Sequence, residues 1–117
     1  MITTKVVGTV QATIYCGLKE RYDGEQHTYD EAIEFCKEYC KIGLCVTVTP
    51  TTFCYTTGSE SGIIVGLINY PRFPKCKEDI YMCAEDLAKN LMKKFNQNRV
   101  SLICGHYTIM LEAEELS

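Results

Sequence analysis

The chain lacks the sequence motifs of the common hydrolases and nucleotide-dependent enzymes. It contains no Gly-x-Ser-x-Gly elbow, no phosphate-binding Gly-x-x-x-x-Gly-Lys-Ser/Thr loop and no His-Glu-x-x-His helix. Each of those motifs supplies a nucleophile, a phosphate cradle or a metal site at a fixed spacing. Their absence argues against serine hydrolases, nucleoside triphosphatases and zinc proteases.

Long hydrophobic runs and a strongly basic charge are missing as well. The longest apolar runs, such as Gly62 to Ile68, are far shorter than the roughly 20 residues of a membrane-spanning helix. The formal net charge is −3, whereas a protein that grips duplex nucleic acid needs many phosphate contacts. We therefore predict no membrane partner and no duplex nucleic acid. A small phosphorylated ligand, in contrast, needs only a few well-placed cations.

The chain has eight cysteines, but no Cys-x-x-Cys pair and no charged-then-apolar leader at its N-terminus. Without the pair, zinc binding and thiol redox chemistry are weakly supported. Without the leader, an intracellular, reducing setting is favoured over a secreted disulfide scaffold. Most of the cysteines fall at apolar periodic positions, where a thiol packs as a small hydrophobe. We predict no metal site and no cofactor.

Hydrophobic periodicity divides the chain into alternating strands and helices. Apolar and polar residues alternate over 9–18, which predicts a strand with one buried face. Apolar residues at helical spacing over 28–42 and 79–95 predict helices, with Thr28 and Asp79 as caps and Gly43 as a stop. Strand-favouring residues predict strands over 44–57, 62–70 and 100–112, the first two joined by a turn at 57–61.

This order, β-α-β-β-α-β, predicts an α+β, ferredoxin-like fold with two helices packed on one face of a four-stranded antiparallel sheet. Residues 1–117 are expected to form a single domain. The other sheet face would carry Thr13, Thr47 and Thr49, so it is polar but short of charge. Such a face could stay wet, pair with another copy of the chain, or line a ligand site.

The first candidate site lies in "GLKERYDGEQHTYD", where Arg21 and His27 precede a helix that Thr28 caps. A helix N-terminus attracts anions through its free N–H groups and its dipole, so a phosphate could bind there. A solvated connector would look much the same, because nearby acidic residues neutralise the cations.

Two further segments combine a cation with groups that suit a nucleotide. In "NYPRFP", Phe73 could stack on a base while Arg72 binds a phosphate, or Phe73 could simply pack under a helix. In "FNQNRVSL", the amides of Asn96, Gln97 and Asn98 could contact a base or ribose, and Arg99 a phosphate. Asparagine also commonly ends a helix because it tolerates the left-handed conformation, which is the structural alternative.

The segment "GHYT" contains His106-x-Thr108, the catalytic unit of the two-histidine phosphoesterases. Those enzymes need two such units facing each other, with one histidine as the base and the other as the acid. Here His27 is followed directly by Thr28, so the second unit has the wrong spacing. The motif is a weak indication of catalysis, and we predict no catalytic residue.

"IYCGLKERY" before a capped helix and "KFNQNRVSL" before the last strand together resemble the phage Thoeris anti-defence protein family, a family of cyclic-nucleotide sponges. The resemblance implies a small oligomer that binds cyclic nucleotide immune signals without cleaving them, notably a cyclic ADP-ribose isomer and in some members cyclic oligonucleotides. It also implies action in the cytoplasm of the infected bacterial host. Carried onto this sequence, it implies ligand contacts at Arg21, His27, Thr28, Arg72, Phe73 and Arg99.

The function expected from the sequence is therefore sequestration by a protein that is not an enzyme. A cyclic nucleotide would be buried between copies of a homo-oligomer, a dimer or a hexamer, and held by arginines and aromatic rings. The resulting loss of free signal would block Thoeris-type antiviral signalling. Two alternatives stay open at this point: a two-histidine phosphodiesterase that degrades cyclic nucleotides, and a small oligomeric docking domain with no ligand.

Overall fold

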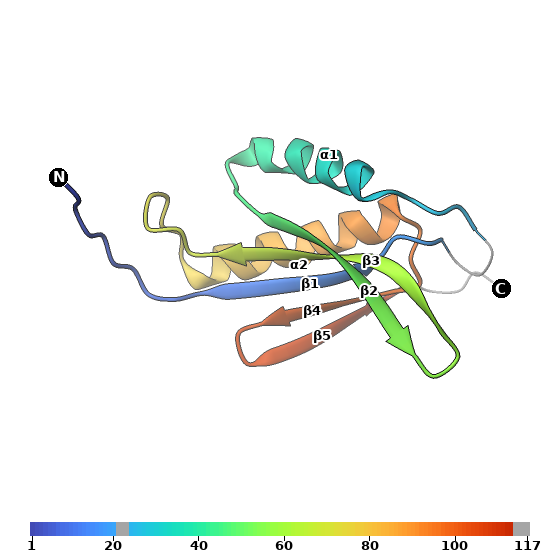
Figure 1. Ribbon diagram of the computed structural model, residues 1–117. Helices are drawn as coiled ribbons and strands as arrows, with labels where there is room; N and C mark the ends of the chain where they lie inside the picture. Colours follow the sequence, from blue (N-terminus) through green and yellow to red (C-terminus); the bar gives the residue numbers. More distant parts are fainter. Residues whose placement is uncertain (21–23, 114–117) are drawn as a thin grey trace.

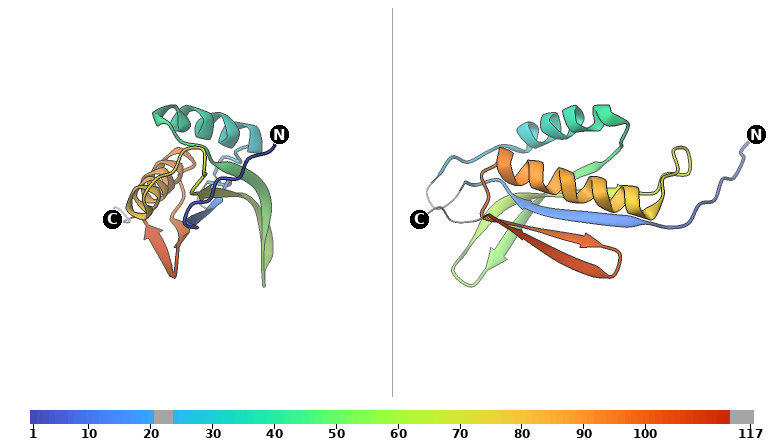
Figure 2. Two further views of the ribbon diagram at one scale, coloured as in Figure 1. Left: turned by 90° about the vertical axis from the view of Figure 1, so that its left-hand side faces the viewer. Right: turned by 180° about the vertical axis from the view of Figure 1, so that it is seen from behind.

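The protein folds into an antiparallel sheet covered on one face by two helices (Figures 1 and 2). The computed structural model describes residues 1–20 and 24–113. The elements are β1 (Gln11–Gly17), α1 (Tyr29–Tyr39), a 3₁₀ turn η1 (Cys40–Ile42), β2 (Thr47–Tyr55), β3 (Gly58–Ile68), α2 (Lys77–Lys94), β4 (Arg99–Cys104) and β5 (Tyr107–Glu112).

The sheet has five strands in the order β2-β3-β1-β4-β5, and every neighbouring pair is antiparallel. The predicted α+β class, with an antiparallel sheet and two helices on one face, is confirmed. The predicted count of four strands is wrong, because the single strand expected over 100–112 is a hairpin of β4 and β5. Gly105 adopts a positive φ of 59° in the turn, which lets the chain reverse after Cys104.

The core lies between the sheet and the helices. Alternate residues of the three central strands point toward α1 and α2, while the helices return one apolar stripe each. Phe95, the C-cap residue of α2, is fully buried in this layer. The buried strand residues are Ala12, Ile14, Cys16, Ile63, Val65, Leu67, Val100, Leu102 and Cys104; the helical ones include Ala32, Cys36, Ile80, Ala84, Leu87, Ala88 and Leu91.

Helix α1 begins as the sequence predicts. Thr28 is its N-cap, and the Thr28 hydroxyl accepts a hydrogen bond from the Glu31 N–H at 3.1 Å. The last turn tightens into η1, and Gly43 ends it with a φ of 102°, in the left-handed region. The chain therefore leaves the helix at the predicted glycine.

Helix α2 starts earlier than predicted and ends in a Schellman motif. Its N-cap is Cys76, whose side chain makes no capping hydrogen bond. Asp79, the predicted cap, lies inside the first turn instead, where its negative charge interacts favourably with the helix dipole. At the other end Asn96 has a φ of 49°, and the N–H groups of Asn96 and Gln97 bond back to the carbonyls of Lys93 and Met92. This geometry sets the direction in which the chain enters β4.

The β2–β3 hairpin is longer and tighter than predicted. Tyr55 pairs directly with Gly58, so the loop has only Thr56 and Thr57 at its tip, and the segment expected to be a turn already belongs to β3. The polar residues at the start of β3 did not predict a strand. They are polar because this end of the hairpin extends past the helices, where few side chains are buried. Residues 1–10 form an extended arm that leaves the sheet at the start of β1 (Figure 1). Neither helix of the described residues has the length and hydrophobicity needed to cross a bilayer.

Candidate ligand site at the end of β1

A polar pocket of about 370 Å³ lies where the chain leaves β1. Three segments meet there: the residues after β1, the tip of the β2–β3 hairpin, and the link from α2 to β4. The pocket contains both signs of charge and one tyrosine. Its lining residues are Lys19, Glu20, Tyr55, Ser59, Glu60, Gln97, Asn98 and Arg99.

Gln97 has a fixed orientation in this pocket. Its side chain is 8% exposed, and its amide nitrogen donates to the carbonyls of Lys19 at 2.7 Å and Phe95 at 2.9 Å. The amide oxygen therefore faces Gly17, where a Cβ atom would lie only 2.6 Å away. The same Cβ position is 3.5 Å from a carboxylate oxygen of Glu60. Two oxygen acceptors thus converge over the backbone of Gly17, an arrangement that suits a cationic group.

Aromatic rings flank Glu60 on the open face of the sheet. Phe53 is its cross-strand partner, and the Phe53 ring fills the space that a side chain at Gly62 would occupy. The Tyr55 ring lies over Gly58, so that a Cβ atom added at Gly58 would be 3.7 Å from the ring. The Tyr55 side chain is 54% exposed. The two glycines let the rings lie close to the sheet, with Tyr55 open to a ligand.

Glu20 is held in the pocket by hydrogen bonds to both of its oxygens. The Asn96 amide donates to Oε1 at 3.1 Å, and the His27 ring donates to Oε2 at 2.8 Å. These two bonds lower the pKa of Glu20 below its usual value, so its carboxylate is charged near neutral pH. Glu20, Glu25 and His27 each offer one atom that could bind a metal ion, and these atoms lie within 4.8 Å of one another. However, both ring nitrogens of His27 bond to carboxylates, so neither is free to bind a metal.

The cations of the pocket are less tightly held. Arg99 is 65% exposed, and its Nε donates to Glu112 on the neighbouring strand β5. An exposed pair of this kind contributes little stability, so Arg99 can turn to a ligand at small cost. Lys19 is also exposed. Anionic groups of a ligand would therefore be bound by mobile side chains and cationic groups by fixed oxygens.

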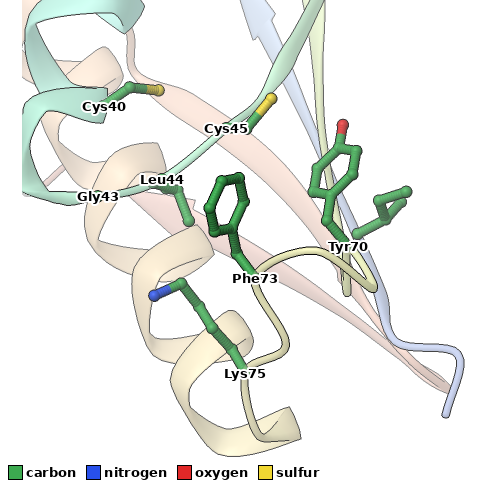
Figure 3. Close-up of a pocket in the computed structure, with 8 residues that line it drawn as sticks. Cys40, Gly43, Leu44, Cys45, Tyr70, Phe73 and Lys75 are labelled. Atoms are coloured by element: carbon green, nitrogen blue, oxygen red, sulfur yellow. The ribbon is translucent and has the colours of Figure 1, made fainter. Parts of the chain in front are cut away.

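A second, apolar pocket of about 280 Å³ lies near the start of β1. The ring of Phe73 points into it between Leu44 and Tyr70 (Figure 3). Cys40, Cys45 and Lys75 complete much of the lining, so Lys75 supplies the one charge among these described residues.

The predicted site residues do not form one cluster. Asn98 and Arg99 line the polar pocket, whereas Arg72 stacks on Phe73 with its guanidinium 5.2 Å from the ring, beside the apolar pocket. The pockets flank opposite ends of β1, roughly 20 Å apart for a strand of this length. Within one chain, the candidate segments that contain Arg72 and Arg99 therefore belong to two separate sites.

The first predicted site has a structural explanation for two of its members. His27 is buried between Glu20 and Glu31 rather than open to a phosphate, and Thr28 uses its hydroxyl to cap α1. Arg21 lies outside the described residues. His106 lies in the β4–β5 turn, near the start of β1, whereas the His27 N–H bonds to Leu18 beyond its end. The two histidines therefore cannot face each other in one chain, and the two-histidine phosphodiesterase alternative is wrong.

Comparison with solved structures gives the fold a precedent. A phage SAM lyase in the apo state superposes with a TM-score of 0.80 and 18% identity, and the match covers 100% of both chains. A phage SAM lyase in complex with S-methyl-5′-thioadenosine has a TM-score of 0.76 and 18% identity, covering 100% of this chain and 99% of that chain. This chain shares their fold. No family model and no curated protein matches the sequence.

The comparison corrects the function expected from the sequence. The predicted sponge that sequesters cyclic nucleotides, and the prediction that the protein is not an enzyme, are both contradicted by a whole-chain match to a lyase fold. The loose motifs misled because arginines and aromatic rings suit many nucleoside-containing ligands, cyclic or not. The resemblance to the Thoeris anti-defence family is not addressed by these structures and stays a prediction.

Sequence reasoning missed most of the polar pocket. Glu20 was considered only as a charge that neutralises nearby cations, Tyr55 only as a strand residue and Glu60 only as part of the turn over 57–61, whereas Gln97 was among the amides predicted to contact a ligand. One signal was available: Glu60 is the single charged residue within 58–68, and glycines stand two residues to either side of it. Glycine within a strand can mark a place where a ligand or another part of the chain approaches the backbone closely.

Proposed function

We propose that this protein is a phage-encoded lyase that splits S-adenosylmethionine (SAM), releasing S-methyl-5′-thioadenosine (MTA). The observation that carries the proposal is the whole-chain structural match to phage SAM lyase, one example of which contains MTA. The polar pocket supports it independently, because its charges complement those of SAM.

SAM presents an α-carboxylate, an α-ammonium group, a sulfonium and an adenine ring. In the proposed complex Arg99 and Lys19 face the carboxylate, while the oxygens of Glu60, Gln97 and Glu20 face the ammonium and sulfonium. The open ring of Tyr55 offers a surface for adenine or for the sulfonium, which an aromatic face attracts. The apolar pocket is a poorer candidate, because no carboxylate is among its described lining residues.

The reaction requires one bond to break between the SAM sulfur and Cγ of its aminocarboxypropyl group. A carboxylate oxygen of SAM can attack Cγ to close a five-membered lactone, and the electron pair of the breaking S–C bond then stays on sulfur. The sulfonium becomes the neutral thioether of MTA, the lactone keeps the ammonium charge, and no proton or water is consumed. The alternative, loss of a Cβ proton to form an alkene, needs a base.

We propose the internal attack because it needs no base, whereas the alkene route would need a base such as a pocket carboxylate, Glu20 or Glu60. His27 is already bonded to two carboxylates, and His106 lies at the other end of β1, so neither histidine is placed to accept a Cβ proton. The role of the protein is then to fold the aminocarboxypropyl group so that its carboxylate reaches Cγ. Arg99 can hold one carboxylate oxygen while the other one attacks.

The finer features expected from the sequence belong to the same proposal. The chain would act in the cytoplasm of the infected bacterial host, where SAM is available. The β-α-β-β-α-β order would be a ferredoxin-like core to which β5 is added. A homo-oligomer remains our expectation, because the open sheet face exposes Tyr55, Met110 and Ile68. The mass of the protein in solution tests this part separately.

The decisive experiment is to incubate the purified protein with SAM and to follow MTA by liquid chromatography and mass spectrometry. We expect MTA and an equimolar four-carbon product. The lactone and the alkene have the same mass, so proton NMR must distinguish them by the vinyl signals that only the alkene has. If the folded protein forms no MTA and its melting temperature does not respond to SAM or MTA, the proposal is wrong.

Variants then locate the reaction. Glu60→Gln and Arg99→Ala should each raise KM for SAM about tenfold, as expected for the loss of a charge-assisted hydrogen bond. Arg72→Ala is the matched control, because Arg72 lies beside the apolar pocket and contacts Phe73. An Arg72→Ala defect as large as that of Arg99→Ala would show that the polar pocket is not the site.

A further inference from the structure

His27 is the most unusual polar residue of the described chain, because it is buried and bonded on both sides to carboxylates. Its Nδ1 lies 2.7 Å from Glu31 and its Nε2 lies 2.8 Å from Glu20, while 9% of the residue is exposed. Glu31 is on α1, and Glu20 lines the polar pocket. The ring therefore connects the first turn of a helix to a wall of the ligand site.

The backbone around His27 is also constrained. The His27 N–H bonds to the Leu18 carbonyl at 2.8 Å, the Glu20 N–H bonds to the Glu25 carbonyl at 2.8 Å, and Lys19 pairs with Gln26 in an isolated β-bridge. The Phe95 ring packs against the imidazole edge to face, with centroids 5.0 Å apart. The imidazole consequently has little room to change its position.

With a carboxylate oxygen at each nitrogen, the ring must donate from both, which only the protonated imidazolium can do. Burial alone would lower the pKa of His27, but the hydrogen bonds to Glu31 and Glu20 outweigh it and raise the pKa above the ordinary value. The negative charge of Glu25, in the segment between β1 and α1, also raises the pKa of His27. The positive charge of Lys94 on α2 helps to lower the pKa of Glu31. Phe95 contributes no charge, and Arg21 and Asp23 lie outside the described residues.

We infer that His27 is a positioning residue, whose imidazolium holds the Glu20 carboxylate toward the cationic groups of the substrate in the polar pocket. This inference rests on the proposed function and assigns a role to a residue that does not line the pocket itself. It predicts that substrate binding weakens when His27 loses its proton.

The reason is geometric. Neutral imidazole has one N–H and one lone pair, so one of the two carboxylates would then face a lone pair at less than 3 Å. That carboxylate must move away or take up a proton. Glu31 is anchored on a helix, whereas Glu20 lies in a connecting segment with Asn96 as its other side-chain partner. Glu20 is therefore the carboxylate that moves, and the ammonium subsite moves with it.

The test compares Glu31→Gln with Glu34→Gln in the SAM cleavage assay from about pH 5 to about pH 9, the range in which a histidine titrates. Glu31 does not line the pocket, and its replacement removes one of the charges that keep His27 protonated. Glu34 is on the same helix, exposed and paired with Lys37, so it is the matched control. Because the α-amino group of SAM also titrates, only a shift that differs between the variants is informative.

We expect KM for Glu31→Gln to equal that of the wild type at the acidic end and to exceed it about tenfold at neutral pH, with kcat nearly unchanged. Glu34→Gln should follow the wild type throughout. Superimposable profiles for all three proteins would overturn the inference. His27→Gln should raise KM most at the acidic end, where wild-type His27 is protonated, and the difference should shrink toward alkaline pH. A His27→Gln protein with wild-type KM at the acidic end would overturn the inference as well.

An NMR titration separates this inference from the proposed function. The His27 ring should titrate at higher pH in the folded protein than in the protein unfolded in urea, and Glu31→Gln should reduce the difference. A folded His27 that titrates as in urea would overturn the inference even in an active enzyme. A wild type that neither cleaves SAM nor binds MTA would instead overturn the proposed function, and this inference with it.

Discussion

Gly17 gives the sharpest quantitative prediction, because the lack of a side chain there is what allows the polar pocket to form. In Gly17→Ala the new methyl group would lie 2.6 Å from the Gln97 amide oxygen. Ordinary contacts between carbon and oxygen are near 3.4 Å or longer, so the amide must move by the better part of an ångström. It cannot do so freely, since its nitrogen is bonded to the carbonyls of Lys19 and Phe95.

The expected cost follows from these contacts. Overpacking costs about 1–3 kcal/mol, and leaving a buried acceptor unsatisfied costs a similar amount. Replacing a glycine restricts the unfolded chain and returns about 0.4–1 kcal/mol. We expect a net loss of about 3 kcal/mol, which lowers the melting temperature by about 12 °C for a chain of this size. Binding of SAM or MTA should weaken in parallel, because Glu60 and Gln97 both lie over this residue.

The assay is thermal and urea denaturation of Gly17→Ala beside Gly8→Ala. A Cβ at Gly8 would meet nothing within 4 Å, so this control has the unfolded-state effect without the clash and should stay within about 0.5 kcal/mol of the wild type. Combining Gly17→Ala with Gln97→Ala should cost at least about 1 kcal/mol less than the sum of the single changes, because they share one contact. A Gly17→Ala protein as stable as the control, or strict additivity, would refute the reasoning.

Three other predictions concern the core, the cysteines and the pH dependence of stability. Phe95→Ala should lower the free energy of unfolding by about 3–5 kcal/mol in urea denaturation, since Phe95 is fully buried against His27 and Phe35; a loss below about 1 kcal/mol would contradict the packing. Burial raises the pKa of Cys16 to about 12 and that of Cys36 to about 11, so a thiol reagent should label exposed Cys45, Cys54 and Cys76 first and these two only on unfolding, as mass spectrometry can determine. The raised pKa of His27 stabilises the fold fully below the ordinary histidine pKa of about 6.5, and this contribution disappears as pH rises through the folded value. The melting-temperature difference between wild type and His27→Gln should therefore shrink from mildly acidic to alkaline pH, and a constant difference would exclude the ionised cluster.

Local sequence signals predicted the elements well where the physics is local. The cap at Thr28, the stop at Gly43 and the left-handed Asn at the end of α2 each depend on a few neighbouring residues, and each is confirmed. The strand boundaries were predicted wrongly where tertiary contacts, rather than neighbouring residues, determine the structure. The β2–β3 hairpin reaches beyond the helices with a polar sequence, and the β4–β5 turn needs only Gly105 and His106 between two strands that look continuous.

The site was harder to predict because the residues that form it are far apart in the sequence. Asn98 and Arg99 were identified because a cation after a helix end is visible in the sequence. Glu20 was not identified as their partner, since Glu20 and Asn96 are 76 residues apart and meet only when α2 ends beside the segment that follows β1. Arg72 and Phe73 looked equivalent to Arg99, but the direction of β3 places them at the opposite end of the sheet.

The sequence by itself determined the α+β class, the apolar stripes that build one core, and the ends of the helices, because periodicity and caps act over one or two turns of chain. Only the tertiary structure decided which charges share a pocket. The register that sets Gly17 opposite Gly62 brings Glu60 and Gln97 over a bare backbone, and the buried ring of His27 holds Glu20 beside them. Those contacts join residues tens of positions apart, so their chemistry exists only after the sheet has formed.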